Sequence, residues 1–236
     1  MTPELLARLR EAQSAKRPVA LLTRLPDGEQ RLWPDDGAPG PLSDAAEAAL
    51  RADKAGPVEL EGERWFVHPH NPPVRLVVVG AVHVAQALVP MAVTLGFAVT
   101  VVDPRRAFAT AERFPGVSLS SDWPDEAMRE MALDARTAVV TLTHDPKLDD
   151  PALDVALRSP CFYVGALGSR RTHAKRVARL HELGHGEGAI GRIHAPVGLD
   201  IAAVTAPEIA LSVLAEVVAA RRGAPLARRA APPEAA

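Results

Sequence analysis

Short apolar runs alternate with helical stretches from residue 75 to residue 183, and this alternation constrains the fold most. Each run is about five residues long and nearly continuous, as expected for strands buried on both faces. Strands that alternate with helices form a parallel sheet covered on both sides, so the pattern predicts an α/β fold with a doubly wound, Rossmann-like parallel sheet. The expected strands are 75–79, 98–102, 117–119, 138–142 and 162–164, and the expected helices are 84–95, 125–133, 151–158 and 170–183.

Proline and alanine mark the expected domain boundaries. Three prolines within residues 69–73 are expected to interrupt any helix or strand ladder. We therefore expect a small α+β N-terminal domain over residues 1–70 and a Rossmann-like cofactor-binding domain over residues 74–222. Residues 224–236 are rich in alanine and proline without apolar periodicity, which predicts a disordered tail.

The N-terminal domain carries local signals for helices and hairpins but no recognisable chemistry. Apolar spacing predicts a helix over residues 3–13. The dipeptides Asp27-Gly28 and Glu61-Gly62 predict two hairpins. Ser43 is the expected N-cap of a second helix that reaches about residue 54.

Composition excludes several classes of function. The chain has 236 residues, with 27 Lys and Arg against 29 Asp and Glu, and such a near-neutral balance argues against a nucleic-acid binder. A single cysteine, Cys161, excludes an internal disulfide and a multi-thiolate zinc site. No apolar run approaches the roughly 18 residues that span a membrane, and the N-terminus lacks the apolar region of a signal peptide. The expected class is a soluble, cytoplasmic protein without a membrane partner.

The first strand-to-helix turn resembles the G-x-G-x-x-G/A pattern of dinucleotide-binding folds. Gly80 and Ala85 occupy the first and third positions, but Val82 occupies the second. A glycine at that second position is what lets the backbone approach a pyrophosphate, and a valine narrows the approach. Ordinary dinucleotide binding is therefore doubtful, and a tight turn without a ligand is the alternative. The candidate cofactor-binding residues of this turn are Gly80, Ala81, Val82 and His83.

Two further strand ends carry candidate ligand contacts. Asp103 stands where a Rossmann acid would receive a ribose hydroxyl, and Arg105 and Arg106 follow it, which suits a polar, anionic ligand. The alternative is a solvated Asp–Arg pair. His144 and Asp145 follow the fourth strand, and we favour ligand contact over acid–base catalysis there. The alternative is that Asp145-Pro146 simply begins a turn. With no second histidine nearby, we expect no metal site.

The fifth strand leads into a glycine-rich turn and a basic helix. Ser169 can cap that helix, and free N–H groups beside arginines form an anion site. The candidate residues are Gly165, Gly168, Ser169, Arg170 and Arg171. Lys175 and Arg179, further along, are expected to form a solvated face.

The remaining signals are mainly structural. Residues 193–200 are expected to form a last loop on the ligand side. Thr205 and Glu208 form a capping box that opens a long helix. Cys161 is expected to behave as a small apolar residue.

Six segments, in order, resemble the C-terminal Rossmann domain of the XdhC/CoxI family, the xanthine dehydrogenase accessory proteins. They are GAVHVAQAL, VDPR, VVTLTHDPKLD, YVGALGSRRTHAKRVARL, PVGLDI and TAPEIALSVLAEVV. The RFP tripeptide of residues 113–115 also matches. The chain departs from the family pattern at Val82 and lacks the Gly-Gly-Cys segment of many N-terminal domains.

The resemblance implies a molybdenum-cofactor chaperone. Such a protein binds molybdopterin, supports its sulfuration with a cysteine desulfurase, and hands it to a xanthine dehydrogenase-type apoenzyme. It is not a turnover enzyme, has no catalytic residues of its own, and is expected to form a homo-oligomer. Two alternatives remain: an NAD(P)-dependent oxidoreductase that binds a nucleotide, and a scaffold whose ligand site has decayed.

Overall fold

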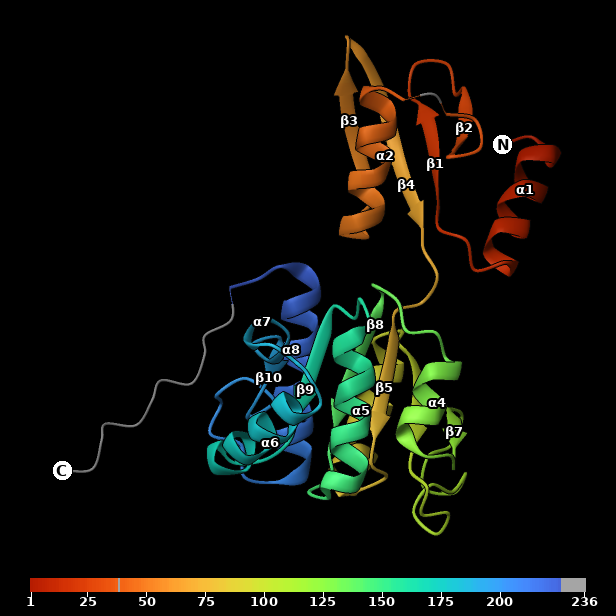
Figure 1. Cartoon of the computed structure of the whole chain (residues 1–236). Helices are drawn as coiled ribbons and strands as arrows, with labels where there is room; N and C mark the ends of the chain where they lie inside the picture. The colour runs from red at the N-terminus through yellow and green to blue at the C-terminus, as the bar shows by residue number, and fades with distance from the viewer. Residues whose placement is uncertain (38, 226–236) are drawn as a thin grey trace. The chain divides into compact units, whose positions relative to one another are not determined.

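The computed structural model describes residues 1–37 and 39–225 in two compact units (Figure 1). The units are Met1–Pro72 and Pro73–Ala236. The predicted disordered tail lies outside the described residues from position 226 onward. Within the described residues, no helix is both long and apolar enough to cross a membrane.

The first unit is a small antiparallel sheet with two helices. Its four strands lie in the order β2-β1-β4-β3, and both predicted hairpins form. Alternate residues of β1 face opposite ways: Leu21 packs with Leu9 of α1, and Leu22 packs in the cluster that contains Ala46 of α2. The elements are α1 (Pro3–Ser14), β1 (Val19–Arg24), β2 (Gln30–Trp33), α2 (Pro41–Ala52), β3 (Gly56–Leu60) and β4 (Glu63–His70).

Two details of this unit differ from the sequence prediction. Helix α2 begins at Pro41, whose fixed φ suits the first helical position, so Gly40 and not Ser43 is the N-cap. Ser43 is the third helical residue, and its hydroxyl accepts the N–H of Gly40 and donates to the Gly40 carbonyl. Strand β4 continues through Pro69, which is paired with Ala20 of β1. The pairing of β3 ends opposite Val67, so Pro69 lies where β4 has a single neighbour, a position that tolerates proline.

The second unit confirms the predicted doubly wound α/β fold. Its six strands lie in the order β10-β9-β8-β5-β6-β7, and every neighbouring pair is parallel. The strands are β5 (Arg75–Val79), β6 (Ala98–Val102), β7 (Ser118–Ser120), β8 (Thr137–Thr141), β9 (Tyr163–Ala166) and β10 (Ile193–His194). The helices are α3 (His83–Thr94), α4 (Pro124–Glu130), α5 (Pro146–Arg158), α6 (Arg170–Glu182), α7 (Glu187–Ile190) and α8 (Ala206–Arg222).

The central strand β5 divides the core of this unit into two clusters. Leu76 and Val78 pack with α3 and α8, whereas Val77 and Val79 pack with α4, α5 and α6. Figure 1 shows α4, α5 and α6 side by side on one face of the sheet. Burial on both faces explains why the strands are continuous apolar runs in the sequence.

Helix α5 and strand β10 depart from the prediction. Helix α5 begins at Pro146, five residues before the predicted start, because Asp145 caps it and Pro146 fits its first position. The helix accommodates Pro151 in its interior, at the loss of one backbone hydrogen bond. Strand β10 is only two residues long, too short for a recognisable apolar run.

Candidate functional site

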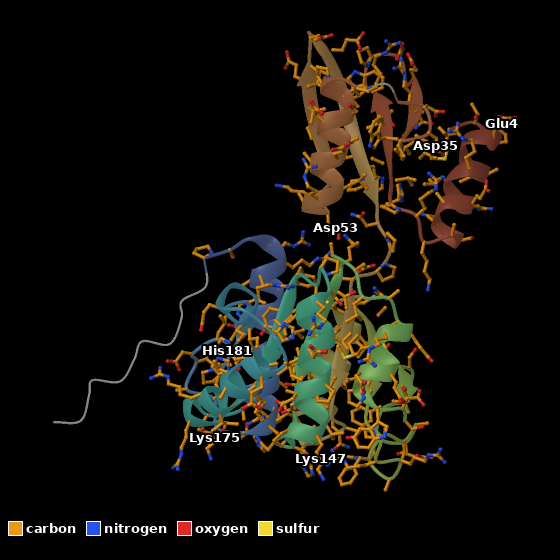
Figure 2. The ribbon with its side chains drawn as sticks, in the orientation of Figure 1. Glu4, Asp35, Asp53, Lys147, Lys175 and His181 are labelled. Atoms are coloured by element: carbon orange, nitrogen blue, oxygen red, sulfur yellow. The ribbon has the colours of Figure 1, made fainter. Side chains whose placement is uncertain are left out.

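A cavity of about 660 Å³ lies at the carboxyl ends of the parallel strands, where β5 and β8 meet. The chain winds outward in opposite directions from these two strands, and open α/β sheets bind ligands at this switch point. The volume lies within the range of small-molecule sites. Lys147, labelled in Figure 2, lies at this edge, at the start of α5. The lining residues are Val82, His83, Val84, Arg105, Leu142, Thr143, His144, Asp145, Pro146 and Leu167.

The turn between β5 and α3 presents backbone N–H groups to the cavity. Gly80 has φ +104°, and a Cβ atom there would lie 2.4 Å from Cγ2 of Thr143, so the turn requires glycine. Val82 is the N-cap of α3 with an extended backbone (φ −94°), which a β-branched residue adopts without strain. No side chain caps α3, so the N–H groups of its first turn can bind an anion.

Asp103 is buried beneath the cavity, and the chain itself occupies both of its carboxylate oxygens. The backbone N–H of Ala81 donates to Oδ2 at 2.8 Å, and Arg105 donates from its backbone N–H, Nε and Nη2 at 3.0, 2.9 and 2.7 Å. Burial alone would raise the pKa of Asp103, but Arg105 and these backbone N–H groups hold it below its ordinary value. Asp103 therefore orients Arg105 and the first turn and does not line the cavity.

Arg105 is the cation of the cavity wall. The Asp103 carboxylate raises the pKa of Arg105, and the guanidinium carbon lies 4.6 Å from the ring centroid of Phe108. The contact with Asp103 uses Nε and Nη2, so Nη1 is the atom left to meet a ligand. A guanidinium held from two sides is pre-organised for an oxyanion.

The loop between β8 and α5 forms the opposite wall. Asp145 caps α5 by accepting the N–H of Lys147 at 2.9 Å, and its own N–H donates to Oγ1 of Thr143 at 3.2 Å. His144 between them is exposed and lines the cavity. This wall thus offers an imidazole and a carboxylate, and the Thr143 hydroxyl orders its backbone.

The loop between β9 and α6 reaches the cavity only through Leu167. Gly165 is buried, and a Cβ atom there would lie 2.6 Å from Cγ2 of Val197. Ser169 caps α6 by accepting the N–H of Thr172. Ser169, Arg170 and Arg171 are exposed.

The structure divides the predicted site residues into three groups. Val82, His83, Arg105, His144 and Asp145 line the cavity. The residues Gly80, Ala81 and Asp103 form the turn and carboxylate beneath it. The others, Arg106, Gly165, Gly168, Ser169, Arg170 and Arg171, are not among its lining residues.

Several lining residues were not predicted, although sequence signals for some of them exist. Thr143 directly precedes His144, and Leu167 stands between the two glycines of the last turn. Thr143 is the first polar residue after a buried strand, and Leu167 lies in a glycine-containing loop after another. Both therefore stand at the carboxyl edge of the sheet, where ligands bind.

A buried polar cluster lies near the predicted last ligand-side loop, residues 193–200. Glu216 of α8 accepts hydrogen bonds from the Tyr163 hydroxyl at 2.5 Å and from the Gly198 N–H at 2.8 Å, and it lies 3.1 Å from Nδ1 of His194. Burial would raise the pKa of Glu216, but His194 and these donors lower it. The cluster ties the loop to α8, and none of its members lines the cavity.

A family model described as the XdhC Rossmann domain matches residues 76–217, from β5 into α8. The chain belongs to the XdhC family. This result confirms the resemblance seen in the motifs, and the matched residues contain the whole cavity wall.

Curated relatives of this XdhC-family chain come from two bacteria. It is 37% identical over 160 residues to the uncharacterized protein YqeB of Escherichia coli (68% of this chain, 30% of that protein). It is 37% identical over 151 residues to the molybdenum cofactor insertion chaperone PaoD of the same organism (64% and 41%). It is 30% identical over 158 residues to a probable xanthine dehydrogenase subunit of Bacillus subtilis (66% and 46%). The matches thus span less than half the length of these relatives.

A solved structure shares the fold. The crystal structure of a xanthine dehydrogenase from Bacillus halodurans matches with a TM-score of 0.72 at 24% identity. The match covers 98% of this chain and 66% of that one, so both units of the XdhC-family chain have counterparts in it.

Proposed function

We propose that this chain binds the molybdenum cofactor and acts as an accessory protein that delivers it to a xanthine dehydrogenase-type apoenzyme. The observation that carries the proposal is the cavity at the β5–β8 switch point, where the uncapped start of α3 and Arg105 converge. A relative named as a molybdenum cofactor insertion chaperone supports the choice of cargo.

The donor set of the cavity fits that cargo. Molybdopterin carries a phosphate, which matches the free N–H groups of α3 and the oriented guanidinium of Arg105. Its pterin ring offers amino and imino groups, which match the carboxylate of Asp145 and the imidazole of His144. Ser169, Arg170 and Arg171 remain proposed contacts for a part of the cargo that extends beyond Leu167.

An accessory role is favoured over nicotinamide-dependent oxidation. A dinucleotide-binding site needs an acid free to accept ribose hydroxyls, and here Arg105 and two backbone N–H groups engage both oxygens of Asp103. Val82 also stands where the pattern calls for glycine. The proposal includes sulfuration of the cargo together with a cysteine desulfurase, and self-association of the chain.

Equilibrium titration with molybdenum cofactor tests the site. Changing Arg105 to Gln removes the charged donor, and we expect affinity to fall roughly tenfold to a hundredfold, since hydrogen bonds between charged groups are the strong ones. The control Arg129→Gln alters an exposed arginine of α4 and should change affinity less than about twofold.

Two further arms complete this titration. The double variant Arg170→Ala/Arg171→Ala examines the start of α6, and unchanged affinity would remove these residues from the site. NADH and NADPH serve as competing ligands. Tight binding of either nucleotide, with no binding of molybdenum cofactor to the folded wild-type chain, would contradict the proposed function.

A further inference from the structure

Helix α6 carries a row of cations, and one of them is buried. Arg170, Arg171 and Lys175 are exposed, as the labelled Lys175 illustrates in Figure 2. Arg176 retains only 1% of its exposure and lies one turn before the buried Leu180. Contacts inside the protein therefore determine where the Arg176 guanidinium lies.

Those contacts reach two walls of the cavity. Nη2 of Arg176 donates to the carbonyl oxygen of Leu167 at 3.0 Å, and it lies 3.4 Å from Oδ2 of Asp149. The other oxygen of Asp149 accepts a hydrogen bond from Oγ1 of Thr143 at 2.6 Å. Leu167 and Thr143 both line the cavity, from the β9–α6 and β8–α5 loops respectively.

Fold stability does not explain a charge at this position. Within residues 1–37 and 39–225, Nε and Nη1 of Arg176 have no hydrogen-bond partner, although both atoms are buried. A buried guanidinium with unused donors is costly, and replacing a buried ion pair with apolar side chains is often neutral or stabilising. Burial also raises the pKa of Asp149, to about 6, against the opposing effects of Thr143 and Arg176.

We infer that Arg176 is a positioning residue of the cavity, which holds Leu167 directly and Thr143 through Asp149. Arg176 does not contact the cargo. It fixes the two loops between which the cargo binds, so the inference rests on the proposed function of that cavity. The contacts from Arg176 through Asp149 to Thr143 then lower the stability of the fold and fix the shape of the cavity.

The experiment compares Arg176→Met with the double variant Asp149→Leu/Arg176→Met and with the control Lys175→Met, which alters an exposed cation of the same helix. Urea denaturation reports stability, and titration with molybdenum cofactor reports affinity. Hydrogen exchange of the Leu167 and Asp145 amides, which donate to Thr141 and Thr143, reports loop order without any ligand.

We expect Arg176→Met to be less stable, because it leaves the Asp149 carboxylate buried without its cation. The double variant should regain at least the wild-type stability. In the double variant the two loop amides should exchange roughly tenfold faster, while Val78 in β5 exchanges no faster than in the wild type. In Arg176→Met the lower stability should speed exchange of Val78 as well. Affinity should fall roughly tenfold in both variants. Lys175→Met should match the wild type throughout.

The stable double variant decides the inference even if Arg176→Met does not fold. Wild-type affinity and wild-type amide protection in the double variant would overturn it, since Arg176 would then only fill space. Failure of the wild-type chain to bind molybdenum cofactor would instead overturn the proposed function, and the amide exchange would still decide whether Arg176 positions the loops.

Discussion

Cys161 is the single cysteine of the chain, and its thiol is buried just before β9. Burial raises the pKa of this thiol to about 11. Thiolates and not thiols are the nucleophiles of sulfur chemistry, so the residue has the properties of a small apolar side chain. We therefore expect Cys161 to take no part in the proposed sulfuration.

Thiol labelling tests this point. We expect the native chain to react with a disulfide reagent at pH 8 roughly a hundredfold more slowly than a free cysteine, because two units of pKa reduce the thiolate fraction by that factor. Labelling in urea gives the unprotected rate of the same thiol. A native rate equal to the rate in urea would show that Cys161 is accessible.

Residue roles were predictable where they follow from local sequence. The capping box of Thr205 and Glu208 forms as predicted, because both partners lie within one helical turn. The sequence also placed Asp103 at the end of its strand. That Arg105 and Ala81 donate hydrogen bonds to both oxygens of its carboxylate depends on the direction of the side chain, which the sequence does not show. In the sequence Arg176 resembles the exposed cations around it, and only the packing of α6 against α5 and the β9–α6 loop distinguishes it.

Helices α5 and α6 show how element boundaries and electrostatics depend on tertiary contacts. Pro151 marked a helix start in the sequence, yet the cap at Asp145 and the contacts of α5 with its neighbours extend the helix back to Pro146. Asp149 and Asp150, which this extension places on α5, pair with Arg176 and Arg179 of α6. The interface between the two helices therefore contains one buried ion pair, Asp149–Arg176, and one more exposed pair, Asp150–Arg179.

Asp149 should make the unfolding free energy of the chain depend on pH. Because burial raises the pKa of Asp149 from 3.8 to about 6, the folded chain binds that proton more tightly than the unfolded chain does. Unfolding free energy should therefore fall as pH rises between these values, by about 3 kcal/mol from this group.

The variant Asp149→Asn lacks the titrating group and provides the reference. Urea denaturation of both proteins from pH 3.5 to 7 should show the wild type losing stability relative to the variant across pH 4–6. A constant difference between the two curves over this range would refute the assignment.

For the whole molecule, the alternation of apolar runs and helices was sufficient to predict the doubly wound sheet. Strands buried on both faces leave a clear pattern, and parallel connections restrict the topology. The cavity was predictable only as an edge of that sheet. Its walls depend on how far each loop extends, which is why Leu167 lines it and Ser169, two residues later, does not.

Native mass spectrometry of the chain purified from a molybdenum-replete host reports the bound cargo and the number of copies in one spectrum, and so tests whether this chain carries molybdenum cofactor. We expect a species heavier than the bare chain by the mass of a molybdenum cofactor, and a complex of more than one chain. The mass of NAD or NADP in its place, or only the bare chain from a host that makes the cofactor, would contradict the proposed function.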